Sequence, residues 1–102
     1  MLYFVILTYI RPIEDVQSHL DSHRDWLIEY SKKGNIIVAG PLEGRTGGAV
    51  LACCQDRAEL DDMLARDSFN VHRLVSYEVK TFSVALRAEA FPASWAPEAK
   101  AV

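Results

Sequence analysis

His23 and Asp67 are the two side chains in this sequence best suited to perform acid–base chemistry together. His23 lies within a run of apolar residues that recur with the three-then-four spacing of the core-facing side of an amphipathic helix. Asp67 follows a second apolar pattern one helical turn after Leu64, close to the face on which Leu60 lies. Each side chain should therefore point inward. The first pattern consists of Ile13, Val16, Leu20, His23, Leu27 and Tyr30.

A carboxylate beside an imidazole fixes the tautomer of the ring, and this arrangement is the one that general acid–base catalysis uses. The alternative is structural. A histidine on a core-facing stripe can be a hydrogen-bonded packing residue, and Asp67 can cap the turn before Ser68. Periodicity alone leaves both interpretations open.

The other reactive residue types occur in weaker patterns. His72 begins the last predicted strand, where it can border a pocket or simply lie in solvent at the end of the strand. Cys53 and Cys54 are adjacent, so in a strand they point to opposite faces and are poorly placed to bridge each other. They have neither CxxC spacing nor clustered histidines, so we expect no metal site and no cofactor. The glycine-rich stretch Gly44–Gly48 has no phosphate-loop pattern and predicts a hairpin turn.

Composition is that of an ordinary globular domain: 102 residues, 50% hydrophobic and 25% charged. A net charge of −3 without lysine or arginine runs gives no electrostatic footprint for nucleic acid or an anionic membrane. The apolar N-terminus, Met1–Ile10, lacks a basic leader and is too short to cross a bilayer, so it reads as a strand. Unpaired cysteines favour a reducing, cytoplasmic location.

Six segments alternate in the order β-α-β-β-α-β, the split βαβ arrangement of ferredoxin-like α+β domains. Right-handed crossovers place both helices on one face of a four-stranded antiparallel sheet. The second helix is marked by the D-x-x-E capping signature of Asp56 and Glu59. Strands are predicted at Leu2–Tyr9, Asn35–Ala39, Ala49–Cys54 and Leu74–Phe82, and helices from Ile13 to the stop signal Lys32-Lys33-Gly34 and at Arg57–Arg66.

Three of the four strands are apolar on both faces, but two helices can cover only one face of a sheet. Because an apolar patch of this size is rarely left in water, we expect a second copy of the chain to cover it, sheet on sheet, as a two-fold homodimer. The alternative is that residues 84–102, an alanine-rich extension with Phe91 and Trp95, cover the open face of a monomer. We therefore divide the chain into a domain at 1–83 and an extension at 84–102 that packs on its own domain or on the partner.

The stretch HRDWLIEYSKKGNIIVAGPL, in which Gly40-Pro41 begins seventeen residues after His23, resembles the YCII-related (YciI-like) domain family. So does a glycine-containing turn into a short strand, followed by a helix that ends in Asp67 before an aromatic residue, Phe69. The resemblance covers Leu2 to Phe82. It implies a dimeric α/β-barrel, related to muconolactone isomerases and small cofactor-free monooxygenases, with a His–Asp active site at His23 and Asp67.

The sequence departs from the family at Ser68, where proline usually follows the aspartate, and at Asn70–Arg73, which lacks the usual small Ala-Gly pair.

The leading hypothesis is a cofactor-independent enzyme in which His23 acts as general acid or base on a small cyclic or aromatic substrate, in an isomerisation or elimination. The alternatives are a non-catalytic dimeric ligand-binding or accessory domain with a structural His–Asp pair, and an oxygen-dependent monooxygenase. The candidate substrate-binding residues are Gly40, Pro41, Phe69 and His72.

Overall fold

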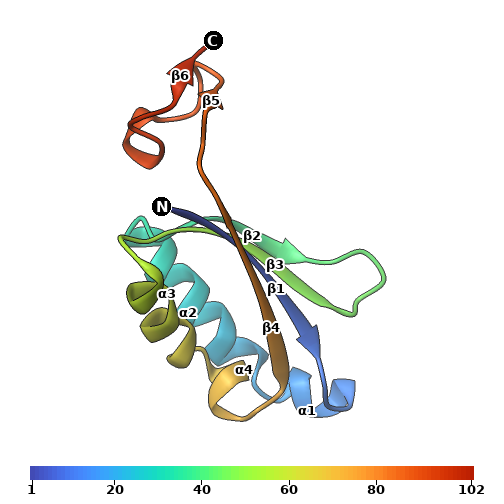
Figure 1. Cartoon of the computed structure of the whole chain (residues 1–102). Coiled ribbons are helices and arrows are strands. Elements are labelled where there is room, and N and C mark those ends of the chain that lie inside the picture. Colours follow the sequence, from blue (N-terminus) through green and yellow to red (C-terminus); the bar gives the residue numbers. More distant parts are fainter.

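The structure, a computed structural model, describes all 102 residues of the chain (Figure 1). The body of the molecule contains four strands and four helices, and the extension contains two very short strands and one 3-10 turn. In chain order the elements are β1 (Leu2–Tyr9), α1 (Ile13–Gln17), α2 (Leu20–Lys32), β2 (Ile36–Pro41), β3 (Gly47–Cys53), α3 (Arg57–Ala65), α4 (Ser68–Val71), β4 (Val75–Phe82), β5 (Leu86–Arg87), η1 (Ala93–Trp95) and β6 (Lys100–Ala101).

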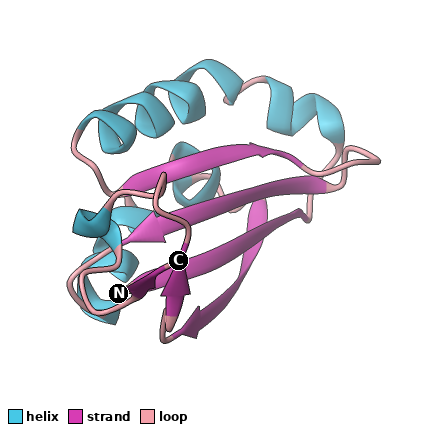
Figure 2. Ribbon diagram, turned by 90° about the horizontal axis from the view of Figure 1, so that it is seen from above, coloured by secondary structure: helices cyan, strands magenta, loops and turns pink.

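The four long strands form one antiparallel sheet in the order β2-β3-β1-β4. This order confirms the ferredoxin-like α+β arrangement predicted from the sequence. The helices α2 and α3 lie side by side on one face of the sheet, and the other face carries no helix (Figures 1 and 2). No helix has the length and the apolar character that crossing a membrane requires.

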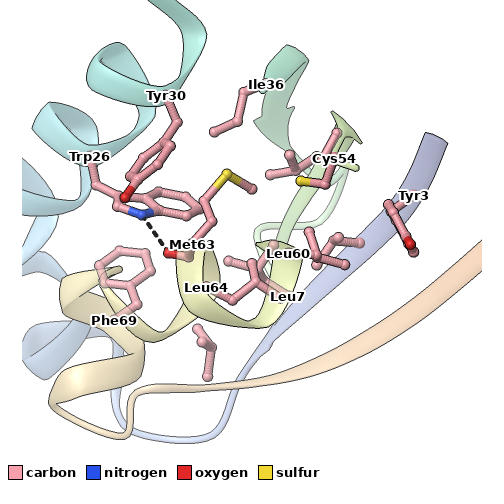
Figure 3. Packing of buried hydrophobic residues seen from close by; sticks show 14 of the residues in the cluster. Tyr3, Leu7, Trp26, Tyr30, Ile36, Cys54, Leu60, Met63, Leu64 and Phe69 are labelled. Carbon is pink, nitrogen blue, oxygen red and sulfur yellow. Dashed lines mark hydrogen bonds between the residues drawn. The ribbon is translucent and has the colours of Figure 1, made fainter. Parts of the chain in front are cut away.

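The hydrophobic core lies between the sheet and the helices α2 and α3 (Figure 3). Alternate residues of β1, Tyr3, Val5 and Leu7, point into it, as the two-residue period of a strand requires. The Trp26 indole N–H of α2 donates a hydrogen bond to the Met63 carbonyl of α3, at 2.9 Å, and so joins the two helices across the core. Burial raises the pKa of the Cys54 thiol to about 11, so this cysteine is a neutral packing group.

The predicted first helix is interrupted, because α1 ends at Gln17 and α2 begins at Leu20. The Ser18 hydroxyl donates to the Asp15 carbonyl at 2.6 Å, and His19 leaves the helical region with φ −116° and ψ 14°. A side chain that bonds the carbonyl of the preceding turn competes with continuation of the helix. The apolar face nevertheless keeps its direction across the break, so His23 still points inward and is buried.

The predicted capping signature of the second helix is confirmed, since the Glu59 backbone N–H donates to the Asp56 carboxylate at 2.9 Å. The helix α3 ends at Ala65, one residue earlier than expected. A further single-turn helix, α4 (Ser68–Val71), was not predicted. It contributes Phe69 to the core and has Asp67 as its N-cap residue.

Residues 84–102 form a small unit beyond the end of the sheet nearest the N-terminus (Figure 1). Its strands β5 and β6 pair in parallel, and the rings of Phe91 and Trp95 lie 5.6 Å apart. The extension leaves the open face of the sheet uncovered, where Phe4 remains 45% exposed and Val38 63% exposed.

Gly47, at the start of β3, is a position that admits no side chain. A Cβ atom there would lie 1.7 Å from the backbone carbonyl oxygen of Leu7, so the central strands would have to separate. We expect Gly47→Ala to reduce the free energy of unfolding by about 3 kcal/mol, at the upper end for overpacked sites. The matched control is Gly40→Ala, since a Cβ at Gly40 meets nothing within 4 Å and the change should fall within about 0.5 kcal/mol. Equal urea midpoints for the two variants would show that the close approach is not rigid.

Candidate active site

His23 and Asp67 form a buried hydrogen bond between two different helices. The His23 Nδ1 atom lies 2.7 Å from the Asp67 Oδ1 atom, and the two residues are 9% and 0% exposed. His23 lies in the first turn of α2, and Asp67 immediately precedes α4. The contact between these two side chains, which the sequence patterns predicted, is therefore present.

Three donors hold the carboxylate of Asp67 in place. Its Oδ1 atom accepts hydrogen bonds from the His23 ring and from the Phe69 backbone N–H, the latter at 3.1 Å. Its Oδ2 atom accepts one from the Tyr77 hydroxyl at 2.9 Å. A fully buried carboxylate requires such partners, and three of them from different parts of the chain fix its orientation.

Tyr77, on β4, was not identified as a site residue from the sequence. The pKa of its hydroxyl is raised, first by burial and then by the neighbouring charge of Asp67, so the phenol remains a proton donor in this hydrogen bond. In the structure Tyr77 pairs with Leu7 of β1. The sequence held a signal for the face on which Tyr77 lies, because Tyr77 alternates with Val75 and Val79 along the strand. That alternation places its ring on the helix-covered face.

Ser68 does not turn Asp67 away from His23, although the family usually has proline at this position. The Ser68 hydroxyl donates to the His19 carbonyl at 3.3 Å and accepts from the Ser22 hydroxyl at 2.8 Å. These contacts tie the start of α4 to the first turn of α2. The position of Asp67 is thus secured by polar contacts rather than by the rigidity of a proline ring.

The His23 ring has one nitrogen held by the protein and one nitrogen without a protein partner. Its face stacks on the Phe69 ring, with centroids 3.8 Å apart and planes 3° from parallel. Nδ1 donates to the carboxylate, which leaves the lone pair on Nε2 in the neutral ring. Nε2 makes no hydrogen bond within the chain, and it is not completely buried. His23 is one of the residues that line the adjoining cavity.

That cavity has a volume of about 810 Å³ and lies between α1–α2 and the β2–β3 half of the sheet. Its size is in the range of sites that bind small molecules. Apolar side chains make most of its lining, and His23 is part of its wall. Its lining residues come from β1 (Leu7, Tyr9), α1 (Ile13, Val16, Gln17), α2 (Leu20, His23, Arg24, Leu27), β2 and the following turn (Ala39 to Arg45), β3 (Gly47 to Val50) and α4 (Phe69).

The predicted substrate-binding residues do not all reach this cavity. Gly40, Pro41 and Phe69 line it. His72 does not line it, and its ring stacks on the His19 ring with the ring centroids 3.7 Å apart. Asp67 is fully buried and does not line the cavity either. Its carboxylate can therefore affect a ligand in the cavity only through its hydrogen bond to the imidazole of His23.

Replacing Tyr77 by phenylalanine should test the support of the carboxylate. The variant removes the hydroxyl that Asp67 Oδ2 accepts from and leaves the ring in place. We expect the free energy of unfolding to fall by about 1.5–3 kcal/mol, the usual contribution of a hydrogen bond to a charged group. Thr81→Val is a control on the same strand, because its hydroxyl donates to a backbone carbonyl instead, that of Leu2. Urea unfolding that gives equal losses for both variants would contradict a special role for Tyr77.

The fold and the buried pair describe a ferredoxin-like domain with a histidine at the wall of a small-molecule cavity. Residues 1–83 match the YCII-related domain family, and the chain belongs to that family. A search of curated proteins found no match.

Among solved structures, one similar chain is 5-chloro-2-hydroxyhydroquinone dehydrochlorinase (TftG) from Burkholderia phenoliruptrix AC1100, in complex with 2,5-dihydroxybenzoquinone. The two chains share 21% sequence identity with a TM-score of 0.66, and the match covers 83% of this chain and 96% of the other. This likeness supports the fold alone.

Proposed function

We propose that this protein is a cofactor-independent enzyme that uses His23 as a general acid and base on a small cyclic or aromatic substrate. The observation that carries the proposal is the asymmetry of the ring: Nδ1 is fixed by a buried carboxylate, whereas Nε2 has no protein partner in a residue that lines the cavity. A structural histidine would have both nitrogens satisfied by protein groups. The chemistry of the dehydrochlorinase with the same fold, by its name an elimination on a hydroxylated ring, is compatible with this proposal.

The imidazole of His23 can carry out every proton transfer that such a reaction requires. In an elimination, Nε2 takes a proton from the substrate, the released electron pair forms a double bond, and the leaving group departs as an anion. In an isomerisation, the same nitrogen returns the proton to another carbon of the ring. Asp67 stabilises the imidazolium that forms in either case, and Tyr77 is a positioning residue behind it.

The proposal is tested by incubating the purified chain with a panel of chlorinated hydroxyhydroquinones and unsaturated lactones. Chloride release and ultraviolet spectra separate elimination from isomerisation. We expect turnover of at least one ring class, abolished when His23 is changed. Binding of these rings without turnover would instead favour a ligand-binding or accessory domain.

We further infer that a second copy of the chain covers the open face of the sheet. This face carries exposed Phe4, Val38 and Phe82, and a hollow of about 320 Å³ lies next to Leu51. An apolar sheet face is commonly buried against its own symmetry mate. We place the extension against the partner, since its strands β5 and β6 lie beyond the end of the sheet (Figure 1). We place the molecule in the cytoplasm, where its free cysteines remain reduced.

Sedimentation velocity should find a dimer at micromolar concentration. Val38→Asp should shift the population to monomer, because it places a charge on the apolar face that the second copy would bury. Ile28→Asp is a matched control, as Ile28 is 53% exposed on α2, away from the sheet. A monomeric wild-type chain would contradict the inference.

A further inference from the structure

The charged side chains around the cavity have a positive net charge, whereas the chain as a whole has a negative one. Three residues of formally charged type border the cavity besides His23, namely Arg24, Glu43 and Arg45. Two arginines against one glutamate give this site a positive balance, whereas the whole chain carries a net charge of −3. The cavity should therefore attract anions, although the protein as a whole is acidic.

Both cavity arginines have unused hydrogen-bond donors. Neither Arg24 nor Arg45 has a carboxylate within 4.0 Å, and Glu43 pairs with neither of them. The arginines at the two ends of α3 behave differently. Arg57, its first residue, pairs with Asp61 at 2.8 Å, and Arg66, its C-cap residue, pairs with Asp62 at 3.5 Å, each one helical turn away. The guanidinium groups at the cavity remain available to a ligand.

The two arginines border the same cavity from two different elements. Arg24 follows His23 directly on α2, and Arg45 lies in the turn between β2 and β3. The turn is closed by hydrogen bonds from the Arg45 N–H to the Leu42 carbonyl, at 3.1 Å, and from the Leu42 N–H to the Gly47 carbonyl, at 2.9 Å. The backbone that carries Arg45 is thus fixed, in the left-handed region with φ 58°. Arg73 has the same conformation, with φ 55°, outside the cavity, so the backbone angle by itself does not mark a site.

The rest of the lining selects an apolar body. Leu7, Val16, Leu27 and Val50 are among the apolar residues that line the cavity, and the Phe69 ring stacks on the imidazole. A ligand that uses the whole cavity therefore needs a flat apolar ring beside His23 and an anionic group toward the arginines. A carboxylate matches the planar, two-pronged geometry of guanidinium groups.

We propose that the substrate is a small cyclic or aromatic carboxylate, whose carboxylate is bound by Arg24 and Arg45 while its ring lies at Nε2 of His23. This inference deepens the proposed function, on which it rests for the role of His23. Arg24 and Arg45 are binding residues that select the substrate by its charge, and they hold the ring within reach of the base.

The test is calorimetric binding of two rings of equal shape to the full-length chain, 4-hydroxybenzoate and its neutral counterpart 4-hydroxybenzamide. We expect the carboxylate to bind about tenfold to a hundredfold more tightly at low salt, and the ratio to shrink as salt rises. Arg24→Gln and Arg45→Asn should each remove most of the ratio. Asparagine is chosen at position 45 because it tolerates a positive φ. Arg73→Asn is the matched control with the same backbone change outside the cavity, and it should leave the ratio intact.

The inference is overturned if the wild-type chain binds neither ring, if it binds both equally, or if Arg73→Asn lowers the ratio as much as Arg45→Asn. A His23→Asn variant separates this result from the proposed function, because it should keep the preference for the carboxylate while losing turnover. Carboxylate preference without turnover of any carboxylated or neutral ring would sink the proposed function alone. Turnover of neutral rings without a preference for carboxylates would sink the inference alone.

Discussion

Replacing His23 by asparagine should lower kcat/KM by about 10²- to 10⁴-fold, the usual contribution of a general acid or base, while the chain stays folded. Asparagine retains a nitrogen donor near the position of Nδ1, so Asp67 keeps a partner. It has no counterpart of Nε2, the atom beside the cavity. The variant therefore removes the proton acceptor and little else, and turnover of the best substrate in the panel measures its effect.

His19→Asn is the matched control for this variant. His19 also belongs to the start of α2, but its ring stacks on His72 and does not line the cavity. We expect its kcat/KM to stay within about threefold of the wild type, in keeping with a surface change of less than about 0.5 kcal/mol. Full activity of His23→Asn, or an equal loss in both variants, would exclude His23 as the acid–base group.

Asp67→Ala should be the most destabilising substitution at the site, with a loss of about 3–5 kcal/mol in the free energy of unfolding. Three buried or partly buried donors lose their acceptor at once: the His23 ring, the Phe69 N–H and the Tyr77 hydroxyl. Because small domains are stable by only about 5–15 kcal/mol, the variant should unfold at markedly lower urea concentration.

A second N-cap aspartate provides the comparison. Asp56 caps α3 through one exposed hydrogen bond, to the Glu59 N–H, so Asp56→Ala should lower stability by about 1 kcal/mol. Asp67→Ala and Tyr77→Phe should also be non-additive, since both act on the Oδ2 hydrogen bond. If Asp67→Ala were no more harmful than Asp56→Ala, Asp67 would be an ordinary helix cap.

The sequence pattern predicted the inward position of Asp67, but the helix geometry behind that prediction differs from the one in the structure. The seven-residue spacing from Leu60 treats Asp67 as a continuation of α3, but that helix ends at Ala65. Asp67 turns inward as the N-cap of α4, a helix of one turn. Such a short helix has too few residues for an apolar period to show. The direction of His23, in contrast, follows from a pattern long enough to persist across the break between α1 and α2.

The parts of the site that sequence patterns missed depend on contacts between distant segments. The bond between Tyr77 and Asp67 exists because β4 pairs with β1 and brings Tyr77 opposite Leu7 under the helices. Arg45 lies in a turn whose glycines indicate flexibility but not the cavity beside it. The sequence predicted His72 near a pocket because it begins a strand, but in the structure its ring stacks on the His19 ring. Local periodicity carries no information on these pairings.

Nitrogen NMR of the His23 ring offers the most direct measurement, because the proposed chemistry needs the proton on Nδ1 and a free Nε2. In long-range proton–nitrogen spectra of ¹⁵N-labelled protein, at a pH where the ring is neutral, we expect the Nδ1-protonated tautomer. The Nε2 resonance should move when a ring ligand fills the cavity, and the Nδ1 proton should stay in place. A proton on Nε2, or an Nε2 resonance that no cavity ligand moves, would contradict the assignment of His23 as the acid–base group.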